Sequence, residues 1–109
     1  MSPSQEIVLI LSTVLPEQSE ALAKVLLGRR LAACVNVMPV RSYYHWKGDV
    51  CEDQEHLLIA KTTKTKADGV IAAIREIHPY ELPEIIAVPV IAGFAPYLEW
   101  VYQETRDDA

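Results

Sequence analysis

The segment HPYELPEI, residues 78–85, concentrates reactive side chains within a few positions. They are His78, Tyr80, Glu81 and Glu84. An imidazole and carboxylates can bind a metal ion, and together with a phenol they can move protons. The segment also contains two prolines, so an ordinary turn between two apolar stretches is the alternative interpretation. Whether the segment is a reactive site or an ordinary turn depends on the structural elements on either side of it.

A second candidate metal site lies on a predicted β-hairpin. Gly48-Asp49 is a plausible two-residue turn, and that register places Trp46 opposite Cys51, His45 opposite Glu52 and Arg41 opposite His56. His45 and Glu52 could then hold a cation at the surface. The alternative is that the pair only stabilises the hairpin through ordinary cross-strand contacts.

Catalysis finds little support in the sequence. Glu81 and Glu84 could serve as acid and base, but no nucleophile stands next to them in the sequence. The phosphate-binding, zinc-protease, CxxC and serine-hydrolase motifs are all absent. We therefore expect a protein that is not an enzyme.

Two further groups could bind a ligand. Lysines and threonines over residues 61–66 come just before a predicted helix, where an anion could bind, although solvated charges explain them as well. Aromatic side chains could line a cleft, or could belong to the core or an interface; they are Trp46, Tyr80, Tyr97 and Trp100.

Composition limits the class of protein. The chain has 109 residues, half of them hydrophobic, which predicts one domain with a packed core. The net charge of −5 disfavours nucleic-acid binding. The N-terminal apolar run is short and has no basic residues before it, so neither a secretory signal nor a membrane span is expected. Cys34 and Cys51 are then expected to be reduced thiols in the cytoplasm.

The pattern of apolar residues predicts seven elements. A buried strand covers residues 7–11, and a helix begins at Pro16. Two long extended segments follow on either side of Gly48. A helix then carries Val70, Ile71, Ile74 and Ile77 on one face, with a capping box formed by Thr65 and Asp68. Pro79 ends it near His78. A strand containing Pro89 and a short helix near Pro96 complete the chain.

This order predicts an α+β, ferredoxin-like β-α-β-β-α-β fold with an antiparallel sheet, a long hairpin between the second and third strands, and an extra C-terminal helix. Proline lacks the N–H that a central strand needs, and Pro39 and Pro89 fall in the second and fourth strands. The first and third strands should therefore be central. The hairpin is longer than an ordinary strand pair and carries Tyr43, Tyr44 and Trp46, so we expect copies of the chain to cover it in a homo-oligomer.

Several blocks together resemble one known family. They are LAACVNV, the Ser42-Tyr43 to Lys47-Gly48 segment, EHLLIAKT over residues 55–62, HPYELPEI, and YLEW over residues 97–100. In this order and spacing, which covers about residues 7–101, they resemble the CutA (CutA1) divalent-cation-tolerance proteins. The resemblance implies a ferredoxin-like homotrimer associated with tolerance of divalent metal ions, with weak metal binding at most. The alternative, from the similar architecture of the PII signalling proteins, is a trimer that binds a small molecule or a partner protein in clefts between subunits.

The resemblance also implies a possible site for copper or another divalent cation. Family members that bind copper use a cysteine at the end of the first strand and a pair of histidines before the Pro-Tyr. Here Ser12 and Ile77 replace two of these ligands, and only His78 matches. The alternative for His78 is a cap on the last turn of its helix. For a cleft between subunits, the candidate residues are Trp46, Lys61, Tyr80, Glu84, Tyr97 and Trp100.

Overall fold

The computed structural model describes residues 5–107 of the chain. Residues 1–4 lie outside that range. The expectation that the N-terminus is not a secretory signal partly concerns these residues. The elements are β1 (Ile7–Val14), α1 (Ser19–Gly28), β2 (Cys34–Trp46), β3 (Asp49–Thr63), α2 (Ala67–Ile77), β4 (Ile86–Pro89) and α3 (Ala95–Glu104). Their types and order match the prediction. None of the helices in the described range is long and apolar enough to cross a membrane.

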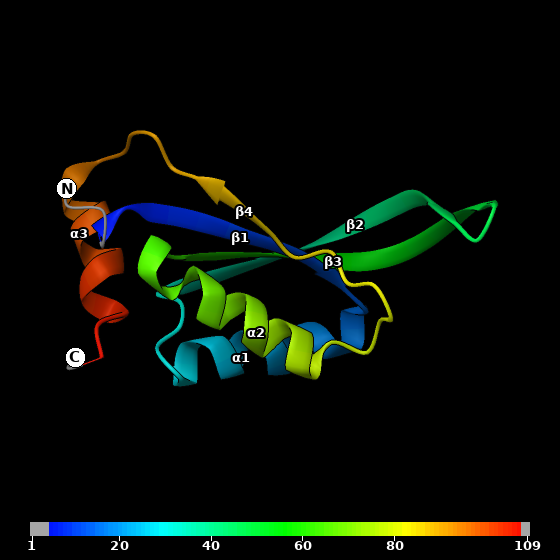
Figure 1. The fold of residues 1–109 in the computed structure, drawn as a ribbon, viewed down its shortest axis with the longest axis horizontal. Coiled ribbons are helices and arrows are strands. Elements are labelled where there is room, and N and C mark those ends of the chain that lie inside the picture. Colours follow the sequence, from blue (N-terminus) through cyan, green and yellow to red (C-terminus); the bar gives the residue numbers. More distant parts are fainter. Residues whose placement is uncertain (1–4, 108–109) are drawn as a thin grey trace.

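The four strands form one antiparallel sheet in the order β2-β3-β1-β4 (Figure 1). The two central strands are β1 and β3, as the positions of the prolines predict. β1 is longer than expected, because Ser12, Thr13 and Val14 continue the pairing with β3 as far as His56. The antiparallel ferredoxin-like fold is therefore confirmed.

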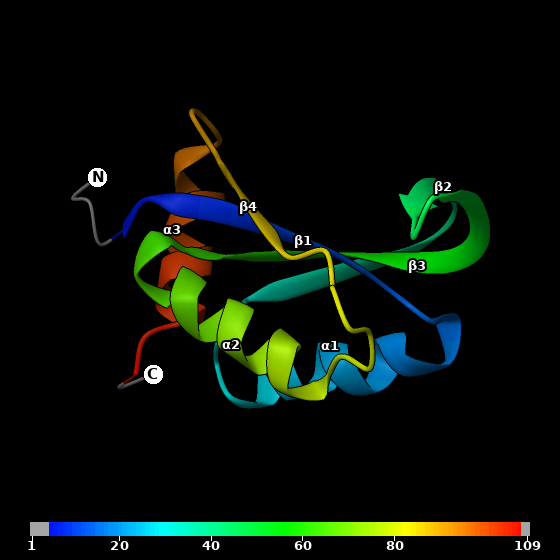
Figure 2. The same cartoon turned by 45° about the vertical axis from the view of Figure 1, so that its right-hand side comes forward.

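Helices α1 and α2 pack side by side on one face of the sheet (Figures 1 and 2). Alternate residues of the central strands point to that face and are almost completely buried. The core cluster that they form with both helices includes Val8, Ile10, Val14, Leu22, Leu26, Leu58, Ala60, Val70 and Ile74. Burying each of the larger aliphatic side chains stabilises the fold by roughly 1.5–3 kcal/mol. The opposite face of the sheet carries neither α1 nor α2.

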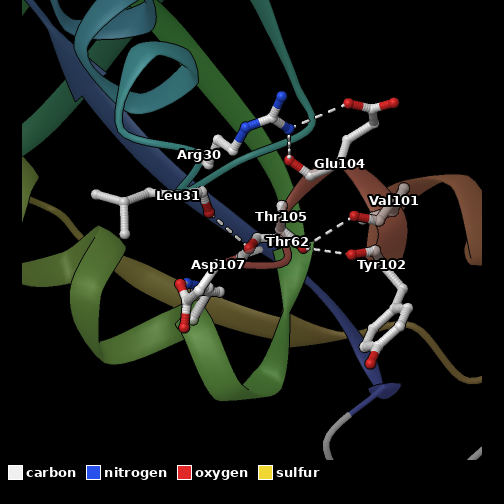
Figure 3. A network of polar contacts seen from close by, with 9 residues as sticks. Arg30, Leu31, Thr62, Val101, Tyr102, Glu104, Thr105 and Asp107 are labelled. Carbon is white, nitrogen blue, oxygen red and sulfur yellow. Dashed lines mark hydrogen bonds and ion pairs between the residues drawn. The ribbon is translucent and has the colours of Figure 1, made fainter. Parts of the chain in front are cut away.

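Helix α3 is fastened at its C-terminal end by polar contacts (Figure 3). Arg30 lies in the loop after α1, has a positive φ of 55°, and donates from Nη1 to the backbone carbonyl of Glu104 at 2.9 Å. The Thr105 hydroxyl donates to the carbonyl of Val101 at 2.9 Å. These donors satisfy carbonyls that the end of a helix leaves unpaired. The Arg30 contacts join the end of α3 to the loop after α1, whereas the Thr105 bond lies within the end of α3 itself.

The starts of the first two helices differ from the prediction. Pro16 opens a 3-10 turn, Pro16–Gln18, and α1 begins after it at Ser19. Thr65 likewise lies inside a 3-10 turn, Lys64–Lys66, and α2 begins at Ala67 with no side-chain cap from Lys66. The predicted capping box of Thr65 and Asp68 is therefore wrong, because a tighter turn comes between β3 and the first turn of α2.

The hairpin register also differs from the prediction. Lys47 and Gly48 form the turn, so Trp46 pairs with Asp49 and His45 with Val50. Both turn residues have positive φ angles, 50° for Lys47 and 88° for Gly48. A two-residue hairpin turn of this type needs positive φ at both positions and favours glycine at the second, which matches the twist of the strands. The Gly48-Asp49 turn and the pairs derived from it are wrong.

The outer part of the hairpin extends beyond the rest of the domain (Figure 1). The β1–β3 pairing ends at Val14 and His56, whereas β2 and β3 continue pairing as far as Trp46 and Asp49. The chain accordingly measures 44 Å along its longest axis and 26 and 21 Å along the others. The predicted long hairpin is confirmed.

Replacing Gly48 by alanine should destabilise this hairpin. The left-handed backbone there costs an L-residue roughly 1–2 kcal/mol, so we expect Gly48→Ala to lower the free energy of unfolding by about 1 kcal/mol in guanidinium titrations. Gly28→Ala is the matched control. A Cβ at Gly28 meets no atom within 4 Å and its φ is not positive, so stability should stay equal or rise. Equal losses in both variants would contradict the turn.

Candidate functional site

The loop from His78 to Ile85 crosses from the end of α2 to the start of β4. His78 is the C-cap of α2 and has an extended backbone, as the following Pro79 requires. Its backbone N–H bonds the carbonyl of Ile74 at 2.8 Å. The loop carries Tyr80, Glu81 and Glu84 towards the base of the outer hairpin, so the turn interpretation of this segment is correct at the level of the backbone.

Both ring nitrogens of His78 are engaged. The side chain is 8% exposed, and Nε2 donates to the carbonyl oxygen of Thr13 at 2.7 Å. Nδ1 accepts the backbone N–H of Tyr80 at 3.2 Å, and the two rings meet edge to face at 4.5 Å. A metal ion could coordinate His78 only if one of these hydrogen bonds were broken. The side chain ties the loop to β1 and does not cap α2.

The other two positions of the family's metal pattern offer no ligand. Ser12 is fully buried on the helix-facing side of β1, and its hydroxyl has no hydrogen-bond partner within the described range. Ile77 has an apolar side chain that is 38% exposed. Over residues 5–107, the structure contains no group of three or more histidine, cysteine, aspartate or glutamate side chains placed to hold a metal.

Tyr80 connects the loop to the hairpin. Its hydroxyl donates to Oε2 of Glu55 on β3 at 2.8 Å. Glu55 is only 5% exposed. Burial of the phenol, its hydrogen bond to Glu55 and the negative charge there all raise the pKa of Tyr80. The phenol therefore remains a hydrogen-bond donor throughout the physiological pH range.

A second phenol–carboxylate pair spans the two arms of the hairpin. The Tyr44 hydroxyl on β2 donates to a carboxylate oxygen of Asp53 on β3. That hydrogen bond is the main cause that raises the pKa of Tyr44 to about 12. Together the two pairs hold aromatic rings against carboxylates on the same stretch of β3.

A cavity of about 660 Å³ opens between the end of β1, the outer hairpin and the loop. Its lining includes both phenol–carboxylate pairs, and Trp46, Glu81 and Glu84. The volume lies within the usual range for small-molecule sites. Much of its wall is fixed by hydrogen bonds within the chain, so the cavity does not need a ligand to form.

The structure divides the predicted cleft residues into two groups. Trp46, Tyr80 and Glu84 line the cavity. The remaining three lie together on another part of the chain, where the Lys61 ammonium is 5.5 Å from the centre of the Tyr97 ring and the Tyr97 and Trp100 rings are 5.6 Å apart. A single chain therefore does not bring all six together.

Among the cavity residues that sequence reasoning missed are Tyr44, Asp53 and Glu55, which form the two phenol–carboxylate pairs together with Tyr80. In the correct register Tyr44 pairs with Cys51, and Asp53 is the next residue of β3 on the same face. Diagonal neighbours across two strands are within reach of a long aromatic side chain. The register of the turn was thus the signal that would have found the Tyr44–Asp53 pair. The contact between Tyr80 and Glu55 depends on the loop and left no such signal.

The predicted His45–Glu52 metal pair is wrong. His45 pairs with Val50, and Glu52 instead lies 3.8 Å from the Arg41 guanidinium as an ion pair. This follows from the corrected turn, which moves every partner on β3 by two residues. The two cysteines, Cys34 and Cys51, are both free and partly buried.

The lysines considered for an anion site have partners within the chain. Lys64 pairs with Glu6 at 3.7 Å, and Lys66 pairs with Asp107 near the C-terminal end. Lys61 lies over Tyr97, as described above. The charges of Lys64 and Lys66 are therefore already matched by carboxylates, which agrees with the interpretation as ordinary surface charges.

Comparison with known proteins identifies the family. A family model described as "CutA1 divalent ion tolerance protein" matches residues 7–104. The chain belongs to this family. The "Divalent-cation tolerance protein CutA" of Thermus thermophilus is 44% identical over 103 residues, which cover 93% of this chain and 98% of the relative. The chain spans about half the length of other curated CutA relatives, such as those of mouse and human.

Solved CutA structures share the fold. CutA1 from Oryza sativa superposes with a TM-score of 0.91 at 37% identity, covering 97% of this chain and 99% of that one. The structure described as "PII-like protein CutA" from Nostoc, in apo form, gives a TM-score of 0.88 at 37% identity and covers 91% and 97%. The PII-like CutA fold expected from the sequence is confirmed.

The phenols should titrate late. In alkaline absorbance titrations, Tyr44 should ionise near pH 12 because it donates to Asp53. The pKa of Tyr80 is also raised above that of an ordinary tyrosine, first by burial and then by its hydrogen bond to Glu55. A pKa raised by folding adds stability that is complete below about pH 10 and is lost as pH rises through the folded-state value. Unfolding free energy should therefore fall over this window.

Tyr44→Phe and Tyr80→Phe should each remove one late-titrating phenol, whereas Tyr43→Phe, with Tyr43 on the same strand, serves as the control. If all five tyrosines of the wild type ionised together near pH 10, the two hydrogen bonds would be disproved.

Proposed function

We propose that the protein is a non-catalytic, homotrimeric CutA protein that acts in divalent-cation tolerance by binding a small molecule in the cavity at the outer hairpin. The observation that carries the proposal is that cavity, with its volume of about 660 Å³ and its hydrogen-bonded wall. The names of the relatives provide the link to divalent cations. The engaged nitrogens of His78 speak against strong metal binding by that side chain.

The preformed wall supports a binding role. Tyr80 is fixed from two sides, by its hydroxyl on Glu55 and by its backbone N–H on His78. A site whose side chains are already held loses less conformational entropy when a ligand binds. The arrangement therefore favours recognition.

The open face of the sheet supports assembly. Core residues occupy the alternate positions that face α1 and α2, so the residues between them face the other way. The apolar side chains on that open face are Leu9, Leu11, Met38, Leu57, Ile59, Ile86 and Val88. An apolar surface of this extent on a sheet marks an interface, and further copies of the chain are the partners that we propose.

The edges of the sheet indicate how the copies meet. β2 and β4 are the two outer strands, and each pairs along one side only within the chain. An interface between different surfaces of identical subunits produces a closed ring when the rotation between them allows it. A ring of three covers both edges of every subunit and brings the projecting hairpins beside neighbouring chains.

Sedimentation equilibrium at micromolar concentration should give the mass of a trimer. Leu11→Glu places a charge on the centre of the open face and should yield smaller species or unfolded chain, because a buried unpaired charge is costly. Leu27→Glu is the matched control, since Leu27 is 43% exposed on α1, and it should remain trimeric. A folded wild-type monomer would disprove the assembly.

Metal binding at His78 is expected to be weak. A metal has to displace a hydrogen bond to Thr13 or Tyr80 and finds no second ligand in Ser12 or Ile77. Calorimetric titration with Cu²⁺ and with Zn²⁺ should therefore show no saturable binding below about millimolar concentration that His78→Ala removes. His45→Ala controls for surface imidazoles. Micromolar binding of one ion per subunit, lost in His78→Ala alone, would overturn this part of the proposal.

A further inference from the structure

We infer that the cavity at the outer hairpin binds a protonated organic amine, an inference that rests on the proposed function and names its ligand class. The juxtaposition that carries it is a buried carboxylate, Glu55, among aromatic rings in a concave site whose described lining includes His45 but no lysine or arginine.

The charge of the lining selects a cation. Four carboxylates border the cavity, from Asp53, Glu55, Glu81 and Glu84, and its lining contains no lysine or arginine. A cavity whose walls carry charge of one sign concentrates ligands of the opposite sign. An anionic ligand would meet only repulsion there. The site is thus complementary to a positive group.

Glu55 provides an independent observation. Glu55 as a residue is only 5% exposed, it lines the cavity, and its carboxylate accepts a hydrogen bond from the neutral Tyr80 phenol. Within residues 5–107 no lysine, arginine or histidine forms an ion pair with it. Burying a carboxylate without a positive partner is costly, and such groups are normally paired. An ammonium group entering the cavity would provide the missing charge.

The aromatic rings of the lining favour an organic cation as the ligand. Tyr43, Tyr44, Trp46 and Tyr80 contribute to the lining. Rings attract cations to their faces and also cover the carbon atoms of an organic ligand. The Lys47 ammonium already lies 5.6 Å from the centre of the Trp46 ring, so this ring accepts a cation within the chain itself.

A bare metal ion fits the site less well than an amine. Metal coordination needs several ligands converging on one point, and the described range has no such cluster. Asp53 and Glu55 each already accept a phenol hydrogen bond. Their remaining lone pairs suit N–H donors, which an amine supplies and a quaternary ammonium ion does not. The ligand class is therefore a protonated amine with a carbon skeleton.

Calorimetry on the full-length assembled protein tests the inference in amine-free phosphate buffer at physiological salt. The cationic probes are putrescine, spermidine and tyramine, with Mg²⁺ and citrate as inorganic and anionic comparisons. We expect at least one amine to saturate at one per subunit with a dissociation constant below about 1 mM. Glu55→Gln and Glu84→Gln should each weaken it about tenfold or more, since each removes a charge.

Matched controls distinguish amine binding in the cavity from nonspecific electrostatic attraction of amines to an acidic protein. Glu20→Gln removes an exposed carboxylate on α1, which pairs with Lys24 at 3.2 Å, and should leave amine binding unchanged. Glu55→Gln retains an acceptor for Tyr80, and the exposed Glu84 can be replaced without disturbing the core. In a Trp100→Phe background, Trp46 is the remaining tryptophan and its fluorescence reports the cavity directly.

The outcomes are distinct. Absence of saturable amine binding, or binding that Glu55→Gln leaves unchanged, overturns the inference. Citrate binding that changes Trp46 fluorescence would overturn the amine class while leaving the cavity as a binding site. Mg²⁺ binding that depends on Glu55 would replace the amine by a metal. If none of the probes changes Trp46 fluorescence in a protein shown to be a trimer, that result contradicts both the inferred amine binding and the proposed binding role.

Discussion

The antiparallel pairing of β1 with β3 is the interaction on which the rest of this structure depends. It joins eight successive residue pairs, from Ile7 with Thr63 to Val14 with His56, and brings apolar residues from both strands to each face. One face receives α1 and α2, and the other remains open. β3 continues past the end of this pairing, so in the outer hairpin β2 and β3 pair only with each other. The cavity forms at the point where the pairing with β1 ends.

His78 fastens the loop at that point. Its bond to the carbonyl of Thr13, near the end of β1, fixes where the loop crosses, and its acceptor nitrogen fixes the backbone of Tyr80. Tyr80 then reaches Glu55. A histidine that looks like a metal ligand in the sequence thus acts as a support for a neighbouring phenol. The two roles compete for the same nitrogens, which explains how the motif can persist without its metal-binding companions.

Much of the fold could be predicted from the sequence, because it depends on local patterns. Apolar periodicity located the elements, and the positions of Pro39 and Pro89 identified the edge strands. The hairpin register could not be obtained the same way, since Lys-Gly and Gly-Asp are both plausible turns and only the backbone twist selects Lys47-Gly48. For the site, Tyr80 and Glu84 were visible in one motif. The partner Glu55 was not, because a loop contact between distant segments leaves no periodic trace.

A single chain leaves two imbalances, and they differ in kind. The open face of the sheet presents apolar side chains to water, and the buried Glu55 carboxylate at the cavity has no ion-pair partner among residues 5–107. Further copies of the chain can cover the first. They could relieve the second only by inserting a basic side chain into the cavity, whereas a small cationic ligand can enter it directly. Thr13 lines the cavity, and Leu57, its partner on β3, lies on the open face, so the cavity borders the surface that we propose for assembly.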